Sequence, residues 1–279
     1  MTPIMYPHLD PVALSLGPVK IHWYGLMYMC AFLYFLYVGK WRLRKYGHPY
    51  LTSKFLDDFL FYGICGVVIG GRLGYCLFYQ PVLYFSHPLN IFKIWDGGMS
   101  FHGGMLGVFL AVYIYGRQRN QGFFELTDFV APLVPMGIFF GRVGNFINGE
   151  LWGRIATVQI PFLMIYPQSG SMLPRYPSEI YEAIGEGVIF TIILFMYAHK
   201  PRKVGQVSGV FLFTYGIIRF TLEYFREPDA FLLQFAQKTG LSMGQWLCVP
   251  MIIAGMIIFY LASKNKFYTT PVANTKSVK

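Results

Sequence analysis

Residues 244–262 read GQWLCVPMIIAGMIIFYLA, and none of these side chains is charged. A helix that crosses about 30 Å of hydrocarbon needs roughly 20 predominantly apolar residues. Only a helix or a closed barrel satisfies its backbone hydrogen bonds there, because the bilayer core holds no water. This stretch has the required length and composition, so it predicts a transmembrane helix.

Six further stretches share this length and apolar character. They lie near residues 21–39, 55–78, 99–115, 127–146, 178–198 and 206–225. All seven together predict an all-α polytopic membrane protein with about seven transmembrane helices, in one integral membrane domain over residues 1–279. Composition agrees, because 55% of the residues are hydrophobic and only 13% are charged, against about 25% charged in soluble domains. Lipid is therefore expected to cover much of the surface.

Lysine and arginine are distributed unequally between the two sides of these spans. Fourteen of the 23 lie on one side, six on the other and three within spans. Because cytoplasmic loops carry the excess of positive charge, we expect the N-terminus outside and the C-terminus in the cytoplasm. This topology accounts for the net charge of +10 without a nucleic-acid partner. Residues 149–177, between two spans, are expected to form a small external (periplasmic) cap of short strands and turns.

Several charged residues fall within the predicted spans. An arginine at a helix centre costs about 2.5–3.5 kcal/mol on insertion scales, so partners or a function are expected. The arginines are Arg72, Arg142 and Arg219, and the acidic candidates for pairing with them are Glu182, Glu186 and Glu223.

The spacing of these residues places them on helix faces. Residues three, four or seven apart share one face of a helix. One stripe comprises Tyr215, Arg219, Glu223 and Arg226, and the other comprises Glu179, Glu182 and Glu186. Both stripes lie toward the outer side, which predicts a polar chamber open to that side. Arg–Glu pairs that only fix helix register remain the alternative for any single pair.

The densest motif is GRVGNFINGELWG at residues 141–153. It contains a guanidinium group, two carboxamides and a carboxylate, which can hold phosphate oxygens and orient a headgroup. Its glycines allow the backbone to approach a ligand or a neighbouring helix. Gly137 and Gly141 form a small-xxx-small pair that predicts helix packing, as do Gly66, Gly70 and Gly74 in the second span.

His102 lies in the motif WDGGMSFHGGMLG at residues 95–107. A lone histidine is more often structural than catalytic, but the flanking glycines and the shared membrane level favour a functional role. Histidine titrates near neutrality and can take a proton from a thiol. The cysteines lie in apolar runs without histidine at ligand spacing, so they are interpreted as packing residues and no metal site is expected.

These segments together resemble the prolipoprotein diacylglyceryl transferase family. The matching pieces are HWYGLMY (22–28), GGRLGY (70–75), HGGM (102–105), the 141–153 run, PSEIYE (177–182), Tyr215-Gly216 with Arg219 and Glu223, and FREPD (225–229). They cover about residues 20–230 in family order, and the GRxGNFxNxExxG pattern is long and specific. Met105 replaces the family's usual leucine, which casts no doubt on function.

The resemblance implies the first step of bacterial lipoprotein maturation, in the cytoplasmic (inner) membrane. The donor would be phosphatidylglycerol, and the acceptor the thiol of the lipobox cysteine that follows a prolipoprotein signal peptide. A thioether would form and glycerol phosphate would leave. The family needs no cofactor or metal, and the expected partners are these two substrates and membrane lipids.

The resemblance also assigns candidate site residues. The catalytic candidates are His102, Arg142, Arg219 and Glu150, and the substrate-binding candidates are Arg142, Asn145, Tyr24, Gly153, Arg72, Tyr215, Glu182 and Glu223. Fixed positive charge would stabilise the anion that builds up as the carbon–oxygen bond breaks. A thiol has a pKa near 8.5 and needs activation. Either His102 acts as the base, or the arginines lower the thiol pKa and His102 only positions lipid.

Two rival functions are less well supported by the sequence. An anion transporter would also contain buried arginines, but it predicts paired broken helices in two related halves. It also predicts polar groups on the cytoplasmic side, where these spans are nearly all apolar. A non-catalytic scaffold would not require so many buried polar groups.

Overall fold

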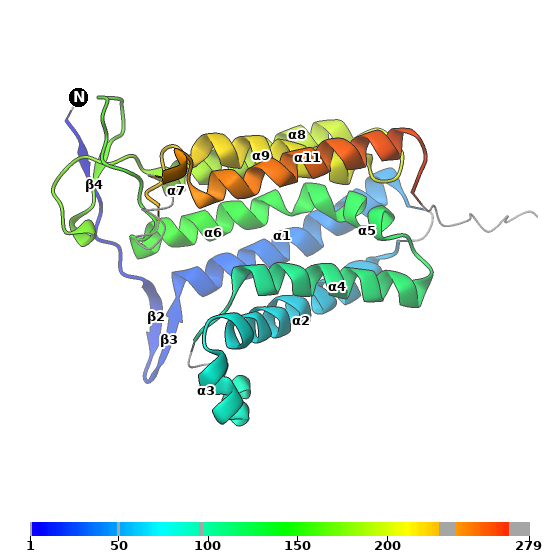
Figure 1. The fold of residues 1–279 in the computed structure, drawn as a ribbon, viewed down its shortest axis with the longest axis horizontal. Coiled ribbons are helices and arrows are strands. Elements are labelled where there is room, and N and C mark those ends of the chain that lie inside the picture. Colours follow the sequence, from blue (N-terminus) through cyan, green and yellow to red (C-terminus); the bar gives the residue numbers. More distant parts are fainter. Residues whose placement is uncertain (1, 49–50, 95–96, 229–237, 268–279) are drawn as a thin grey trace, which may run out of the picture. The chain divides into compact units, whose positions relative to one another are not determined.

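The computed structural model describes residues 2–48, 51–94, 97–228 and 238–267 (Figure 1). Trp95, Asp96 and Asp229 of the motifs above, and Lys276 and Lys279 among the lysines counted for topology, lie outside these ranges. The long helices are α1 (Trp23–Tyr46), α2 (Ser53–Phe78), α4 (Phe101–Arg119), α6 (Pro135–Asn148), α9 (Gln206–Leu222) and α11 (Met243–Ser263). The protein is therefore mostly helical.

Shorter elements connect or extend these helices. The short α-helices are α3 (Pro81–Ser86), α5 (Phe123–Val130), α7 (Ser178–Glu182) and α8 (Phe190–Ala198). The 3₁₀-helices are η1 (Pro88–Phe92), η3 (Ala131–Leu133) and η4 (Pro167–Ser169), and η5 (Ala183–Ile189) is a π-helix between α7 and α8. The strands are β1 (Ile4–Met5), β2 (Val12–Leu16), β3 (Val19–His22) and β4 (Met164–Ile165).

Three described helices are long and apolar enough to cross a membrane: α2, the continuous run Ser178–Ala198, and α11. A fourth candidate consists of Phe123–Leu133 and Pro135–Asn148, which meet at 44°. Pro135 lies at this break, and proline lacks the N–H that would continue the helix. The helical membrane-protein class is thus supported by three to four candidate spans in the described chain, and the count of seven stays a prediction.

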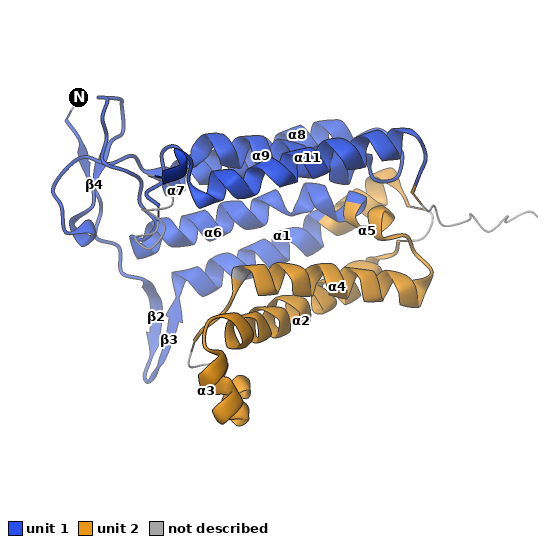
Figure 2. Ribbon diagram, viewed as in Figure 1, with its two compact units in different colours: residues 1–38, 128–266 blue, residues 39–127, 267–279 orange. Residues whose placement is uncertain are grey.

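The chain forms two compact units (Figure 2). Unit 1 comprises Met1–Val38 and Asp128–Lys266, and unit 2 comprises Gly39–Thr127 and Phe267–Lys279. In unit 1, α9 lies along α11, and α6 lies against η5 and α7. In unit 2, α2 lies along α4.

The α2–α4 contact in unit 2 is a direct backbone contact at glycines. A Cβ on Gly70 would lie 2.4 Å from the carbonyl oxygen of Gly103, and one on Gly107 would lie 2.1 Å from that of Gly66. A Cβ on Gly74 would be 2.8 Å from the Gly103 Cα. No other residue fits at such distances, so the predicted packing role of the second-span glycines is confirmed.

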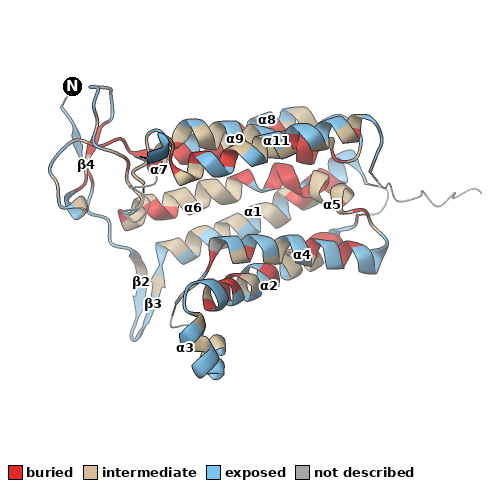
Figure 3. Ribbon diagram, in the orientation of Figure 1, coloured by how far each residue is buried: buried red, intermediate tan, exposed pale blue. Residues whose placement is uncertain are grey.

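The N-terminal segment of unit 1 joins residues that lie far along the chain. β1 pairs in parallel with β4, with Ile4 opposite Met164. Tyr6, Met164 and Tyr166 form a buried cluster at and next to these strands, and Figure 3 shows buried segments in red at β4. Within residues 149–177, the structure has a short strand, β4, and a turn of 3₁₀-helix, η4.

The N-terminal end of α9 is capped by a side chain from another helix. Asp128, in α5, accepts hydrogen bonds from the backbone N–H of Gly205 at 2.6 Å and of Ser208 at 2.7 Å. It also accepts one from the Ser208 hydroxyl at 2.6 Å. The first N–H groups of a helix have no partner within the helix, so a carboxylate here satisfies them.

Candidate active site

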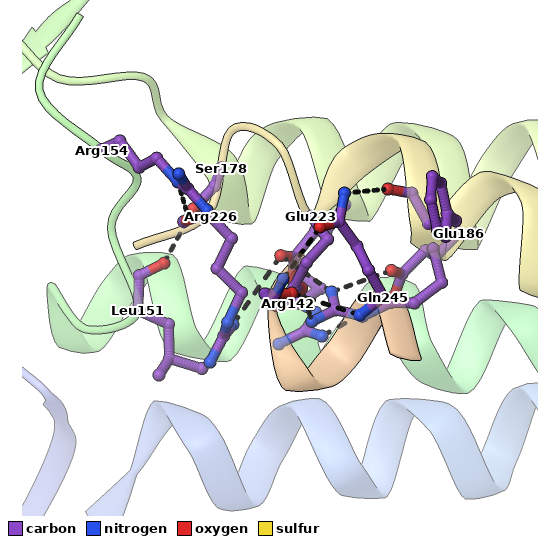
Figure 4. Close-up of polar contacts among 12 residues, drawn as sticks. Arg142, Leu151, Arg154, Ser178, Glu186, Glu223, Arg226 and Gln245 are labelled. Carbon is purple, nitrogen blue, oxygen red and sulfur yellow. Dashed lines mark hydrogen bonds and ion pairs between the residues drawn. The ribbon is translucent and has the colours of Figure 1, made fainter. Parts of the chain in front are cut away.

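Charged side chains of unit 1 meet between α6, the α7–η5 run and the C-terminal end of α9 (Figure 4). We call Arg142, Arg219, Arg226, Glu182, Glu186 and Glu223 the charged cluster. Its centre is well buried, because the side chains of Glu182 and Glu186 are 1% and 0% exposed. Buried charges are tolerated when they are paired, so the pairing decides what the cluster can do.

Glu182 is shared by three arginines. Its Oε2 lies 2.7 Å from Nε of Arg142, and its Oε1 lies 3.0 Å from Nη1 of Arg219. Nη1 of Arg226 is 3.7 Å from the same Oε1. This carboxylate therefore holds three arginines that come from α6, from α9 and from the segment after α9.

Glu186 bridges two of the same arginines. Its Oε1 lies 3.1 Å from Nη1 of Arg219, and its Oε2 lies 3.7 Å from Nη2 of Arg142. Glu186 belongs to the π-helix η5, whose i→i+5 bonding widens the turn relative to an α-helix. Glu182 and Glu186 are four residues apart, and both face the guanidinium groups of Arg142 and Arg219.

Glu223, at the C-terminal end of α9, completes the cluster and links it to the start of α11. It forms an ion pair with Nη2 of Arg219 and accepts a hydrogen bond from the Ser242 hydroxyl at 2.9 Å. Ser242 is also the N-cap of α11 in a capping box with Gln245. The predicted acidic partners Glu182, Glu186 and Glu223 are thus confirmed as partners of the arginines. Ser242 was missed, although Ser-x-x-Gln before an apolar run is a recognisable signal.

The two signs of charge differ in their accessibility. The cluster holds three arginines and three glutamates, so its formal charges balance. The side chains of Arg142, Arg219 and Arg226 are 18%, 15% and 14% exposed, whereas Glu182 and Glu186 are buried. A ligand that reaches this cluster therefore meets guanidinium groups, which suit an anionic phosphate.

The 141–153 motif ends α6 beside the cluster. The Asn145 side-chain amide donates to Glu150 Oε1 at 2.9 Å, and Arg142 Nη1 donates to Asn145 Oδ1 at 3.4 Å. Gly149 ends the helix in the left-handed conformation, with φ of 65°, which glycine adopts without strain. The structure thus brings Arg142, Asn145 and Glu150 together.

The glycines in this motif and just before it have different surroundings. A Cβ on Gly144 would lie 2.7 Å from the ring of Tyr24, and one on Gly153 would lie 2.4 Å from the carbonyl oxygens of Tyr176 and Phe225. By contrast, a Cβ on Gly137 or Gly141 would meet no described atom within 4 Å. Among the described residues of unit 1, no neighbouring helix therefore packs against Gly137 or Gly141, and the predicted helix packing is not borne out within this unit.

Tyr215 lies one turn before Arg219 on α9. Its ring stacks on Phe190, with centroids 5.9 Å apart, and on Phe211 at 6.2 Å. The stripe predicted along α9 therefore divides into an aromatic part at Tyr215 and an ionic part from Arg219 onward. Substrate binding by Tyr215 stays a prediction.

Arg72 and His102 belong to unit 2. Arg72 is 3% exposed. Its guanidinium group donates to the carbonyl oxygens of Asn90, Ile91, Lys93, Gly97 and Gly98. These bonds use its five N–H groups, so Arg72 holds the chain ahead of α4. Binding of substrate by Arg72 stays a prediction.

His102 is exposed and lies in the first turn of α4. Ser100 caps this helix, and its hydroxyl accepts a hydrogen bond from the Gly103 N–H at 3.2 Å. An exposed histidine at a capped helix start can exchange protons with a substrate. Within the described ranges, no group of three or more His, Cys, Asp or Glu side chains could hold a metal ion.

Apolar candidate spans and a paired cluster of buried charges place the chain among helical membrane proteins with a polar site inside the helical layer. Comparison with known families is more specific. The family model for prolipoprotein diacylglyceryl transferase matches residues 11–261. The chain belongs to this family, and it is a transferase.

Curated relatives from several bacteria are similar over nearly the whole chain. The protein from Paracidovorax citrulli (strain AAC00-1) is 53% identical, over 94% of this chain and 98% of the relative. One from Polaromonas naphthalenivorans (strain CJ2) is 53% identical over the same shares. One from Methylibium petroleiphilum is 52% identical, over 94% of this chain and 99% of the relative. Each relative is named phosphatidylglycerol–prolipoprotein diacylglyceryl transferase.

Proposed function

We propose that this transferase moves the diacylglyceryl group of phosphatidylglycerol onto the lipobox cysteine thiol of a prolipoprotein, the first step of lipoprotein maturation. The family and the names of the relatives give the reaction class. One observation carries the assignment to the charged cluster: the side chain of Glu182 is 1% exposed, whereas those of Arg142 and Arg219 are 18% and 15% exposed. A phosphodiester anion is the ligand that this arrangement suits.

The chemistry is a displacement at carbon. The cysteine sulfur forms a bond with the glyceryl carbon that carries the phosphate, and the carbon–oxygen bond breaks. The electron pair stays on the phosphate oxygen, and glycerol phosphate leaves. Negative charge on that oxygen grows as the bond breaks, so Arg142 and Arg219 stabilise the transition state more than the ground state. Asn145, Glu150 and Tyr24 orient the headgroup.

The thiol must lose its proton, and two routes are kept open. In one, His102 accepts the proton as a general base. In the other, the arginines favour thiolate and His102 positions lipid. His102→Gln removes the base but keeps a polar side chain, so near-normal turnover at pH 7 would exclude the first route. Arg142→Lys keeps the charge but loses the planar fork, so near-normal turnover would exclude a bidentate phosphate clamp.

We also propose the seven-span topology in the bacterial inner membrane as a single integral domain. The N-terminus is outside, residues 149–177 form the external cap, and the C-terminus is cytoplasmic. The lysine and arginine asymmetry supports this orientation. Alkaline phosphatase, which is active only outside the cytoplasm, should be active when fused after residue 170 and inactive when fused after residue 203. The reverse pattern would invert the topology.

The function is tested by transfer of labelled diacylglyceryl from phosphatidylglycerol to a lipobox peptide by the purified protein in detergent. Arg142→Ala should abolish transfer, and so should a peptide in which serine replaces the cysteine. Arg119→Ala is the matched control, because Arg119 is 48% exposed and forms an ion pair with Asp58 at 2.8 Å in unit 2. It should transfer normally. A folded wild-type protein that leaves phosphatidylglycerol intact would overturn the proposal.

A further inference from the structure

Tyr6, Tyr166 and Glu179 form a buried group next to the charged cluster, and the reaction above uses none of them. They are 2%, 0% and 1% exposed. The rings of Tyr6 and Tyr166 stack, with centroids 5.2 Å apart and planes 27° from parallel. We call these three residues the tyrosine–glutamate group. Their hydrogen bonds link two helices of the site.

Tyr6 holds the C-terminal end of α6. Its hydroxyl donates a shared hydrogen bond to the carbonyl oxygens of Phe146, at 2.6 Å, and Ile147, at 3.0 Å. The last carbonyls of a helix lack the usual partner within the helix; Tyr6 supplies a donor to the Ile147 carbonyl and a second one to that of Phe146, which also accepts from the Gly149 N–H at 3.0 Å. Asn145 precedes this turn directly, and Glu150 follows it.

Tyr166 holds the start of α7. Its hydroxyl donates to Glu179 Oε1 at 2.7 Å. Glu179 Oε2 is buried and has no hydrogen-bond partner within the described residues. Glu179 lies three residues before Glu182, which pairs with Arg142. The contact from Tyr166 therefore fixes the helical turn that carries Glu182.

One pair of strands carries both tyrosines. Tyr6 directly follows β1 and Tyr166 directly follows β4, and these strands pair in parallel. The Tyr6 N–H also donates to the carbonyl oxygen of Ile165 at 2.9 Å. Because the tyrosines are fixed to each other by backbone and by ring stacking, they hold α6 and α7 at a set separation.

We infer that the tyrosine–glutamate group consists of positioning residues that set the spacing between α6 and α7, and so the geometry of the Arg142–Glu182 ion pair and the Asn145–Glu150 hydrogen bond. The inference rests on the proposed function. The ion pair is 2.7 Å long and spans these two helices. A displacement of about 1 Å at a reacting group can cost on the order of 100-fold in rate. A small shift of either helix should therefore slow the reaction.

The first test is Tyr6→Phe, which keeps the stacked ring and removes the hydroxyl. At temperatures well below the unfolding temperature of the variant, we expect kcat to fall about tenfold. The KM for phosphatidylglycerol should change less than twofold. Tyr224→Phe is the matched control, because Tyr224 is 54% exposed, and its kcat should not change. A Tyr6→Phe variant with a lowered Tm and an unchanged kcat would show a merely structural role and overturn the inference.

The second test compares two changes at Glu179. Glu179→Gln keeps a carbonyl oxygen that accepts from Tyr166, so we expect it to retain most of the wild-type kcat. Glu179→Ala loses this acceptor and should lose kcat about as much as Tyr6→Phe does. A glutamine variant as slow as the alanine variant would contradict positioning through this hydrogen bond.

A third readout does not depend on transfer. The Glu150 N–H donates to the carbonyl oxygen of Asn145 at 3.1 Å, and Tyr6→Phe should speed hydrogen exchange at residues 145–153 in detergent, while Tyr224→Phe should not. Unchanged exchange would overturn the inference. If wild-type protein lacks transfer activity but Tyr6→Phe still speeds this exchange, the proposed function fails while the coupling of Tyr6 to α6 stands.

Discussion

The two ends of α9 both meet carboxylates, but the carboxylates bind in different ways. At the N-terminal end, Asp128 accepts three hydrogen bonds of 2.6 to 2.7 Å from Gly205 and Ser208. At the C-terminal end, both oxygens of Glu182 lie near arginines, yet neither makes a well-directed hydrogen bond to a described residue. Asp128 is therefore held by hydrogen bonds and Glu182 by charge, while Glu186 and Glu223 at the same C-terminal end accept hydrogen bonds as well.

This difference separates a stabilising carboxylate from a reactive site. A fully hydrogen-bonded group gains little from a further ligand. Ion-paired groups without directed hydrogen bonds keep unused bonding capacity, and buried groups of this kind call for an explanation. In the charged cluster, Arg142 Nε and Arg226 Nη1 are donors of this kind among the described residues, and an N–H donor is what a phosphate oxygen accepts from. Each prediction below tests whether stability and catalysis separate along α9 in this way.

The largest effect is expected for Glu182→Gln. The change leaves three arginines without their shared carboxylate, so transfer should fall about 100-fold or more. The free energy of unfolding should fall by about 3–5 kcal/mol, because a buried ion pair loses one partner. Transfer kinetics and thermal unfolding in detergent measure both. A kcat within threefold of wild type would contradict the idea that the C-terminal end of α9 is the catalytic one.

A smaller effect, on stability alone, is expected for Asp128→Ala. The start of α9 loses its cap, and the free energy of unfolding should fall by about 2 kcal/mol. Below the unfolding temperature, kcat should stay within twofold of wild type. Asp128→Asn keeps one acceptor oxygen and should lose less stability. A catalytic loss comparable to that of Glu182→Gln would show that the two ends are coupled.

Ser242→Ala should affect both stability and catalysis. Ser242 caps α11 and donates to Glu223, so the change should lower the free energy of unfolding by about 1 kcal/mol. Glu223 loses one hydrogen bond in the cluster, so kcat should fall about threefold. Ser242→Thr keeps the hydroxyl and is the control. If alanine and threonine give the same kcat, the hydroxyl has no part in the site.

The smallest effect concerns His48, between α1 and α2 and outside both ends of α9. Burial lowers the pKa of His48, with Glu125 opposing this shift and Arg42 adding to it. The neutral ring is favoured in the folded state, so its stabilisation is complete above the unfolded pKa, about 6.5, and is lost as pH falls through the lower folded value. His48→Asn should therefore flatten the loss of Tm between about pH 7 and pH 5. An unchanged slope would contradict this.

Pairing within the charged cluster could be predicted from the sequence because it follows from helical spacing. Arg219 and Glu223 are four residues apart, and Glu182 and Glu186 lie on one face of the preceding helical run. The high cost of an unpaired charge in a membrane then leaves few alternatives. The π-helix η5 that carries Glu186 could not be predicted, because its residues have the same spacing that an α-helix would show.

Contacts between distant segments could not be read from spacing. Asp128 caps a helix that begins 78 residues later in the chain, and its own helix gives no sign of this. Gly137 and Gly141 have the spacing of packing glycines, but spacing does not say whether a partner helix is present. The same spacing at Gly66 and Gly70 did find a partner, because α4 supplies glycines at matching positions.

The hydrogen bond from Tyr6 to Phe146 joins residues 140 apart in the sequence, and this fixes an order of assembly. The first residues of the chain can reach their final place only after α6 and β4 have been synthesised. Contacts between residues so far apart form slowly, because the loop between them must close first. The segment that carries Tyr6 is made long before α6 but is ordered only after it, and the spacing of α6 and α7 is completed at that late step.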